Sequence, residues 1–196
     1  SSSVYMVGNI LLDTLRYNIS RFVRPEVLDN NNVQDGCYLV FTLNRRALLA
    51  DKENLKAMIN AMCDKSKDVK IFAPLRQEAR TIVEPLVAGH KNFVIIEPLS
   101  YLEFGYLTSR AKGIITDSGN VAEEATFNGV PCITLNSYTE HIETVKNGTN
   151  VLVGENASKL SSALTDMLEG RWKQSSLPDR WDGRTAERII KILLDL

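Results

Sequence analysis

The residues whose types and spacing are best suited to binding a ligand lie between Gly113 and Pro131. An apolar run ends there at Asp117, the chain breaks at Ser118-Gly119-Asn120, and helix-forming residues follow. The serine stands where a helix N-cap is expected, and the exposed N–H groups of a helix start attract phosphate. Glycine at such a turn lets a ligand approach the backbone closely. A carboxylate about one turn further on, in the Glu123-Glu124 pair, has the reach for a sugar hydroxyl, so the stretch predicts a nucleotide-sugar site.

Each half of this stretch also has an ordinary structural explanation. Capped turns are far commoner than phosphate sites, so Ser118-Gly119 taken alone is typical of any helix start. Acidic residues near a helix N-terminus favour the helix dipole, and we expect one of Glu123 and Glu124 to serve only that purpose. The combination of the turn with a carboxylate and with the preceding 97–104 segment favours the site interpretation.

The composition is that of a globular protein, since 44% of the 196 residues are hydrophobic and 24% are charged. This length suffices for one large or two small domains. Lys and Arg number 23 against 24 Asp and Glu, and the net charge of -1 lacks the basic excess of most nucleic-acid-binding proteins. No apolar run has the length of a membrane span and no signal segment opens the chain, so we expect a cytoplasmic protein without nucleic-acid or membrane partners.

The cysteines and histidines form no familiar metal-binding pattern. Cys37, Cys63 and Cys132 are widely spaced, and neither His90 nor His141 stands at a usual ligand spacing from them. The first and last of the three cysteines fall in predicted strands. We therefore expect buried free thiols, no disulfide and no metal ion.

Strand and helix patterns alternate along the whole chain. Apolar runs predict strands at 4–7, 37–43, 69–73, 93–96, 113–116, 131–134 and 150–153. Periodic segments predict helices at 10–22, 52–63, 77–87, 101–111, 121–127, 141–146, 158–168 and 184–194. The alternation predicts an α/β fold with a doubly wound parallel sheet of Rossmann-like type.

Aromatic residues outside the predicted strands are expected to serve packing. Helical spacing places Tyr101, Phe104 and Tyr106 in the core. The loop that contains Trp172 and Trp181 is expected to pack the last helix against the body.

Ligands of such sheets bind beyond the carboxyl ends of the strands. Four loops are expected at that edge, at 44–46, 74–76, 97–104 and 116–124. In the first of them Arg45 or Arg46 is as readily a phosphate ligand as a solvated charge, because Arg suits planar oxyanions. No GxGxxG follows the first strand and no P-loop is present, so NAD and ATP-hydrolase interpretations lose their main support.

Three motifs resemble the C-terminal half of the non-hydrolysing UDP-N-acetylglucosamine 2-epimerase family: Glu97-Pro-Leu-Ser-Tyr-Leu-Glu-Phe104, the 116–124 stretch and Tyr138-Thr-Glu-His-Ile-Glu143. The opening Gly8-Asn9 and Asn44-Arg45-Arg46 are also similar to signatures of that family. The family has two Rossmann-like domains of the GT-B type with the active site between them. The resemblance implies that residues 1–196 are one UDP-binding domain, the second of the two, and that the N-terminal catalytic half is absent.

The resemblance also implies roles for individual residues. Phe104, beside Tyr101, would lie in the loop that holds the uracil through its backbone. Ser118 and Gly119 match the diphosphate-binding turn, in which Asn120 stands where the family usually has a second glycine. The remaining substrate-binding residues would be Arg45 at phosphate, Glu124 at the ribose hydroxyls and Glu143 near the nucleotide.

Some positions depart from the family pattern. Asn44 stands where the family usually has a histidine implicated in catalysis, Ala47 where Glu is usual, and His141 where Arg is usual. Asparagine cannot act as a general acid or base near neutral pH. The main acid–base residues are therefore expected in the missing domain, and within this chain only Asn44 and His141 are catalytic candidates.

The activity implied is the interconversion of UDP-N-acetylglucosamine and UDP-N-acetylmannosamine, by elimination and re-addition of UDP, in cell-envelope polysaccharide biosynthesis. This domain would stabilise the leaving diphosphate as its charge grows. We expect the chain to bind UDP or UDP-N-acetylglucosamine without cofactor, to be inactive alone and to form a homodimer as a full-length enzyme. The alternatives are the donor domain of a GT-B glycosyltransferase and a non-catalytic nucleotide-sugar sensor.

Overall fold

Six parallel strands form the centre of the computed structural model, which describes residues 3–196. They are β1 (Tyr38–Thr42), β2 (Lys70–Pro74), β3 (Phe93–Ile96), β4 (Gly113–Thr116), β5 (Cys132–Thr134) and β6 (Asn150–Leu152). Their order in the sheet is β3-β2-β1-β4-β5-β6. The order reverses between β1 and β4, which pair in parallel with Val40 opposite Ile114. Such a reversal is where doubly wound sheets bind their ligands.

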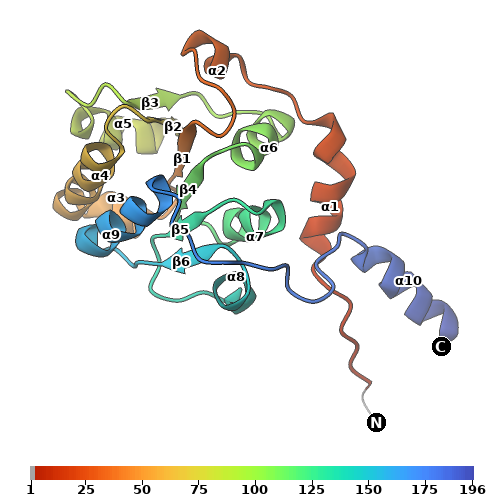
Figure 1. Ribbon diagram of the computed structural model, residues 1–196. Coiled ribbons are helices and arrows are strands. Elements are labelled where there is room, and N and C mark those ends of the chain that lie inside the picture. Colours follow the sequence, from red (N-terminus) through yellow and green to blue (C-terminus); the bar gives the residue numbers. More distant parts are fainter. Residues whose placement is uncertain (1–2) are drawn as a thin grey trace.

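Helices cover both faces of this sheet (Figure 1). In chain order they are α1 (Ile10–Asn18), the 3₁₀ helix Ile19–Arg21, α2 (Glu26–Asn30), α3 (Arg46–Ala50), α4 (Lys52–Ser66), α5 (Gln77–Leu86), α6 (Tyr101–Ser109), α7 (Gly119–Asn128), α8 (Ile142–Lys146), α9 (Ala157–Leu168) and α10 (Thr185–Asp195). Leu39 and Phe41 of β1 face a core shared with α4, α5 and α9, and Tyr38 and Val40 face one shared with α6 and α7. This arrangement confirms the predicted doubly wound α/β fold.

Helix α7 begins and ends as the sequence predicts. The Ser118 Oγ accepts a hydrogen bond from the Val121 N–H at 3.4 Å, which is an N-cap. At the other end Gly129 adopts the left-handed conformation, with φ of 71°, where a side chain would be strained. Helix α6 is capped in the same way by Ser100, whose Oγ accepts from the Glu103 N–H at 3.3 Å. The two serine N-caps therefore fix the positions at which α6 and α7 begin.

Residues 4–7 are not a strand, contrary to the prediction from their apolar run. Val4 is 92% exposed, and the segment pairs with no strand of the described chain. Its backbone is held by side chains instead, because Arg180 donates to the Met6 carbonyl and Arg188 to the Val7 carbonyl. Two short helices, α2 and α3, were also not predicted, since five residues give too little periodicity.

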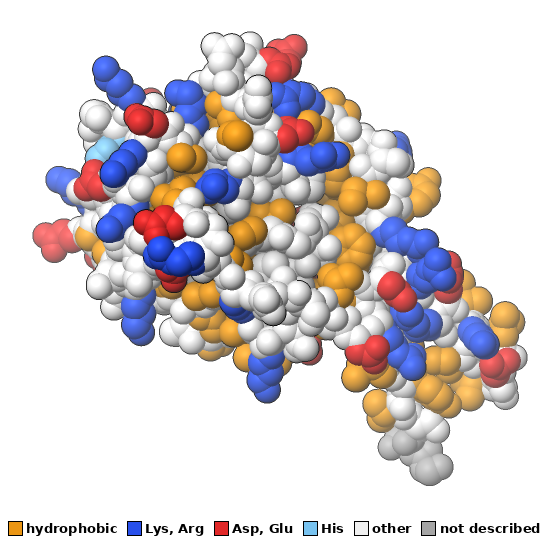
Figure 2. Space-filling view, in the orientation of Figure 1, with side chains coloured by type: hydrophobic (Ala, Val, Ile, Leu, Met, Phe, Trp, Pro, Cys, Tyr) orange, Lys and Arg blue, Asp and Glu red, His pale blue; other side chains and the backbone are white. Residues whose placement is uncertain are grey.

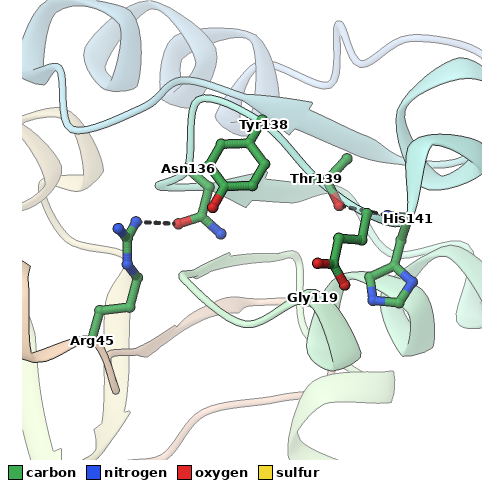
Figure 3. Close-up of a pocket in the computed structure, with 7 residues that line it drawn as sticks. Arg45, Gly119, Asn136, Tyr138, Thr139 and His141 are labelled. Carbon is green, nitrogen blue, oxygen red and sulfur yellow. Dashed lines mark hydrogen bonds between the residues drawn. The ribbon is translucent and has the colours of Figure 1, made fainter.

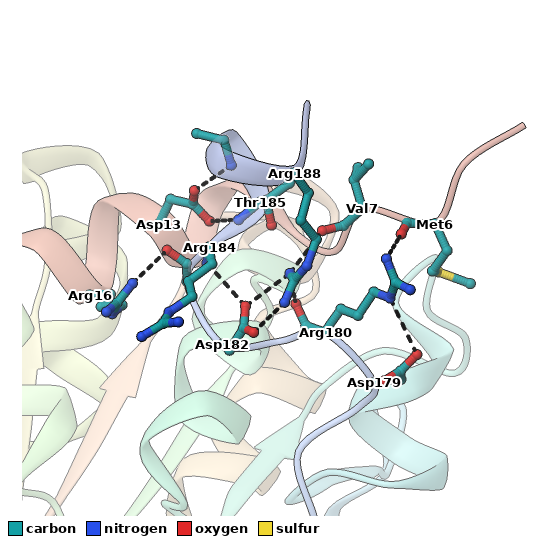
Figure 4. A network of polar contacts seen from close by, with 12 residues as sticks. Met6, Val7, Asp13, Arg16, Asp179, Arg180, Asp182, Arg184, Thr185 and Arg188 are labelled. Carbon is teal, nitrogen blue, oxygen red and sulfur yellow. Dashed lines mark hydrogen bonds and ion pairs between the residues drawn. The ribbon is translucent and has the colours of Figure 1, made fainter. Parts of the chain in front are cut away.

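The last helix is held at its start by a polar network (Figure 4). The Asp13 carboxylate accepts from the Thr185 N–H at 2.9 Å and from the Ala186 N–H at 2.7 Å, so α1 caps α10. Trp181 is buried against Leu12 and Leu15 of α1. The loop holds α10 through the bond from Arg188 to the Arg180 carbonyl, while Trp181 itself packs α1 and the Nε1 of Trp172 donates to the Thr149 carbonyl.

Beyond Thr185, helix α10 buries no residue. Figure 2 shows apolar side chains on this projecting part of the molecule, where Ile190, Leu193 and Leu194 are exposed. Within residues 3–196, no helix has both the length and the hydropathy that crossing a bilayer requires.

Cys37 is exposed and lies in the turn before β1, so its predicted burial in a strand is wrong. Cys63 and Cys132 are buried as predicted, and burial raises the pKa of the Cys63 thiol to about 12.

We expect an aromatic disulfide reagent to modify one thiol per native chain rapidly and the other two only on unfolding, because thiolate character and access control the rate. Absorbance of the released thiol measures the count, and Cys37→Ser should abolish the fast phase; two fast thiols would contradict the assignment.

Candidate functional site

One buried carboxylate joins the two loops at the point where the strand order reverses. Asp117, 6% exposed at the end of β4, accepts from the Asn44 N–H at 2.9 Å and from the Arg45 N–H at 2.6 Å. Both amides belong to the loop after β1. Asp117 therefore orients a loop more than seventy residues earlier in the chain.

A pair of threonine hydroxyls supports the same turn from within the sheet. The Thr116 Oγ1 lies 2.6 Å from the Thr42 Oγ1, and it accepts from the Ser118 N–H at 3.0 Å. Both threonines are buried, at the carboxyl ends of β4 and β1. The N-cap residue of α7 is therefore fixed relative to the sheet by side chains of two neighbouring strands.

A cavity of about 260 Å³ opens beside this turn (Figure 3). It is lined by Arg45, Gly119, Asn136, Tyr138, Thr139, Glu140 and His141. Figure 3 shows Arg45 and His141 on opposite sides of it. The Arg45 Nη1 donates to the Asn136 Oδ1 at 2.6 Å, and the Asn136 Nδ2 donates to the Asp117 carbonyl at 3.2 Å. Asn136 was not singled out from the sequence, although its place just after β5 at the ligand edge was a usable signal.

The cavity suits an anion. The first N–H groups of an α-helix have no partner within the helix and carry a partial positive charge, and Gly119 and Asn120 supply them at the start of α7. Arg45 adds a full positive charge and a planar set of donors that matches phosphate oxygens. Three residues predicted from sequence, Arg45, Gly119 and His141, are thus brought to one cavity.

The glycine at position 119 is required by a close contact. A Cβ added there would lie 2.8 Å from the Cδ2 and 3.1 Å from the Nε2 of His141. Any side chain would push the imidazole away from the helix start or fill the space that a ligand needs. The absence of a side chain therefore keeps the imidazole edge and the helix N–H groups in one place.

Glu123 does more than interact with the helix dipole, the only role expected for one residue of the Glu123-Glu124 pair. Its side chain is 5% exposed, and its Oε1 lies 2.5 Å from the Nδ1 of His141. Burial raises the pKa of the Glu123 carboxyl, and the neighbouring His141 opposes that rise.

Glu124 points to a different neighbour. Burial is the main reason that its pKa rises to about 7, and the charge of Glu123 adds to it. The charge of Glu124 in turn raises the pKa of the Tyr101 phenol, after burial. Tyr101 is 47% exposed, so its expected place in the core is wrong. Helix α6 thus brings the Tyr101 phenol near Glu124 of α7.

Phe104 is not in a loop, contrary to what the resemblance implied. It lies in α6, and its N–H donates to the Ser100 carbonyl at 2.8 Å. The Ser100 cap extends the helix through this position and uses the amide that a uracil contact would need. The irregular part of this segment therefore ends at Ser100.

Glu143 and Asn44 also lie away from the cavity. Glu143 is exposed in the first turn of α8 and does not line it. Asn44 lines a neighbouring cavity of about 260 Å³ with Arg46 and Arg76. The two catalytic candidates, Asn44 and His141, therefore face different cavities.

Comparison with known proteins gives one consistent family. A curated UDP-N-acetylglucosamine 2-epimerase homolog of Methanococcus maripaludis is 36% identical over 209 residues, which cover 100% of this chain and 56% of that protein. The structure of the Methanocaldococcus jannaschii UDP-GlcNAc 2-epimerase in complex with UDP-GlcNAc and UDP matches with a TM-score of 0.80 and 34% identity, over 98% of this chain and 55% of that one. The Neisseria meningitidis UDP-GlcNAc 2-epimerase bound to UDP-GlcNAc matches with a TM-score of 0.81 and 25% identity, over 98% and 56%.

The chain spans about half the length of these relatives. A heptosyltransferase of Escherichia coli shares only the fold, with a TM-score of 0.53 at 15% identity. The family model described as UDP-N-acetylglucosamine 2-epimerase matches residues 1–194. With this match over nearly its whole length, the chain belongs to the UDP-N-acetylglucosamine 2-epimerase family.

Proposed function

We propose that this chain is the UDP-binding domain of an enzyme that interconverts UDP-N-acetylglucosamine and UDP-N-acetylmannosamine by elimination and re-addition of UDP. The observation that carries the proposal is the meeting of Arg45 and the start of α7 in one cavity where the strand order reverses, with Glu124 about one turn further along α7. Relatives at 34% and 25% identity have structures with UDP-GlcNAc bound, and this supports the same ligand class here.

In this proposal each part of the site contacts a different part of the nucleotide. The diphosphate lies in the cavity, against the N–H groups of Gly119 and Asn120 and the guanidinium of Arg45. Glu124 accepts hydrogen bonds from the ribose hydroxyls, with Tyr101 beside it. When the bond from the sugar carbon to the phosphate oxygen breaks, charge grows on the diphosphate, and these fixed donors stabilise it.

The proposal includes a division of labour between two domains. The chain spans about half of each relative, and the family resemblance assigns the acidic catalytic residues to the other half. We therefore place the main proton-transfer residues in a preceding domain and expect residues 1–196 to bind UDP without turnover. A homodimer of the full-length enzyme in the cytoplasm belongs to the same proposal.

Isothermal titration calorimetry tests it. We expect the chain to bind UDP with one site, and to bind UMP and uridine progressively more weakly, because each lacks part of the diphosphate that the cavity holds. ADP is the control nucleotide, because it has the same ribose and diphosphate as UDP but a different base. An absence of heat with both UDP and UDP-GlcNAc would refute the binding proposal, and epimerisation by the isolated chain would refute the division of labour.

A further inference from the structure

The imidazole of His141 is held between a carboxylate and the start of a helix. Its Nδ1 lies 2.5 Å from the Oε1 of Glu123, and its Cδ2–Nε2 edge faces Gly119 at the cavity. The imidazole side chain is 34% exposed, whereas the carboxylate behind it is 5% exposed. One ring nitrogen is thus committed to the protein, and the other is available to a ligand.

The contact with Glu123 decides which hydrogens the ring carries. At 2.5 Å one hydrogen must lie between the Nδ1 and the carboxylate oxygen, because two lone pairs would repel. If the pair holds that hydrogen alone, the Nε2 carries a lone pair, which repels a phosphate oxygen. If the pair holds a second proton, the Nε2 carries a hydrogen and donates to the phosphate. This holds wherever the shared hydrogen sits between Nδ1 and Oε1.

Carboxylates outnumber cations around the ring. Helix α7 presents Glu123, with Glu124 next to it. The segment leading into α8 presents Glu140, and the first turn of α8 presents Glu143. Asn9, from the N-terminal segment, lowers the pKa of the Glu123 carboxyl. Arg45, across the cavity, is the cation among the lining residues, and it is paired with Asn136 and Glu155.

We propose that His141, held by Glu123, donates its Nε2 hydrogen to the diphosphate of the nucleotide sugar, so that ligand binding takes up a proton at this pair. The inference rests on the proposed function and adds to it a pH-dependent ligand contact. No proton moves to the substrate in this step, since the hydrogen is shared in a hydrogen bond only. Because the contact needs the second proton of the pair, it weakens as the pH rises and that proton is lost.

The test measures proton uptake on binding of UDP-GlcNAc. Its diphosphate is esterified at both ends and keeps a constant charge, whereas a terminal phosphate such as that of UDP titrates near pH 6, about the range of interest. Calorimetry at one pH in two buffers of different ionisation enthalpy gives the number of protons taken up per ligand. Glu124 contributes with the opposite sign, because binding ribose to its carboxylate releases a proton, so only differences between variants are used.

Four proteins are compared: wild type, His141→Gln, His141→Arg and His90→Gln. Glutamine is neutral and arginine is permanently charged, so both should remove proton uptake, while arginine keeps a donor to the phosphate. The sequence has two histidines, and His90 lies at the amino end of β3, bonded to Asn60, which makes His90→Gln the matched control. We expect wild type and His90→Gln to take up more protons than the other two. Between about pH 6 and 8, wild-type affinity should fall about tenfold relative to His141→Arg.

The outcomes separate this inference from the function on which it rests. Equal proton uptake in all four proteins, with UDP-GlcNAc bound by each, would overturn the inference and leave the UDP-binding proposal standing. Binding by none of them, wild type included, would overturn both. Glu123→Gln gives a second check, because without the carboxylate the loss of affinity should begin at a lower pH; an unchanged pH profile would count against the pair.

Discussion

Replacing Asp117 by alanine is expected to lower the free energy of unfolding by about 2–4 kcal/mol and to remove most of the affinity for UDP. The carboxylate accepts from the amides of Asn44 and Arg45 at distances down to 2.6 Å, and it is nearly buried. Without it those N–H groups lose charged partners, and the loop that carries Arg45 is released from the start of α7. Denaturant unfolding measures the first effect, and calorimetry with UDP measures the second.

Asp51→Ala is the matched control for this variant. Asp51 also accepts a backbone N–H, that of Asn54 at 3.2 Å, but it caps an exposed helix start away from the cavity. Loss of an ordinary cap costs about 1 kcal/mol and should leave UDP binding unchanged. Equal destabilisation by the two substitutions, with UDP affinity retained in Asp117→Ala, would show that the carboxylate does not hold the site together.

Glu124→Gln is expected to make the chain more stable at pH 8 and poorer at binding UDP. Burial raises the pKa of this carboxyl to about 7 in the folded chain, against 4.5 for the free group. The unfolded chain therefore loses this proton first, and the free energy of unfolding falls as the pH rises from about 4.5 to about 7. The neutral amide avoids that cost, which we estimate at about 1–3 kcal/mol above pH 7.

The UDP affinity of Glu124→Gln should fall although its stability rises. An ionised carboxylate accepts hydrogen bonds from two ribose hydroxyls, and an amide offers one oxygen without charge, so UDP affinity should fall about 10- to 100-fold. Unfolding at about pH 4.5 and 8, with calorimetry at the higher value, gives both numbers. Glu187→Gln, at an exposed position of α10, controls for the general effect of removing one negative charge. A Glu124→Gln protein that is less stable than wild type at both pH values would contradict the account.

The fold was predictable because its signals are local and repeated. The buried strand at 113–116, the cap at Ser118 and the left-handed Gly129 each follow from a few neighbouring residues. The predictions failed where tertiary partners decide. An apolar run at 4–7 resembles a strand but has none beside it, and Cys37 stands just outside the strand to which its apolar neighbours belong.

The candidate site was predictable only in part, for the same reason. Ser118, Gly119 and Arg45 could be placed at the ligand edge from the alternation of strands and helices, and the resemblance gave them roles. The partner of His141 could not be found by proximity in sequence, because Glu123 reaches it from another helix eighteen positions earlier. The helix predicted at 101–111 contains Phe104, so its amide bonds within the helix and not in a loop.

The bond from Asp117 to the loop after β1 also bears on the order of folding. It joins residues 73 positions apart, and β4 pairs with β1 over a similar separation. Contacts of that separation require a large loop to close before they contribute any stability, and they slow folding. The turn at Ser118 can therefore form early as a capped helix start, but the arginine loop joins it only when the centre of the sheet closes. The rate at which the cavity forms during folding therefore measures the rate at which β1 pairs with β4.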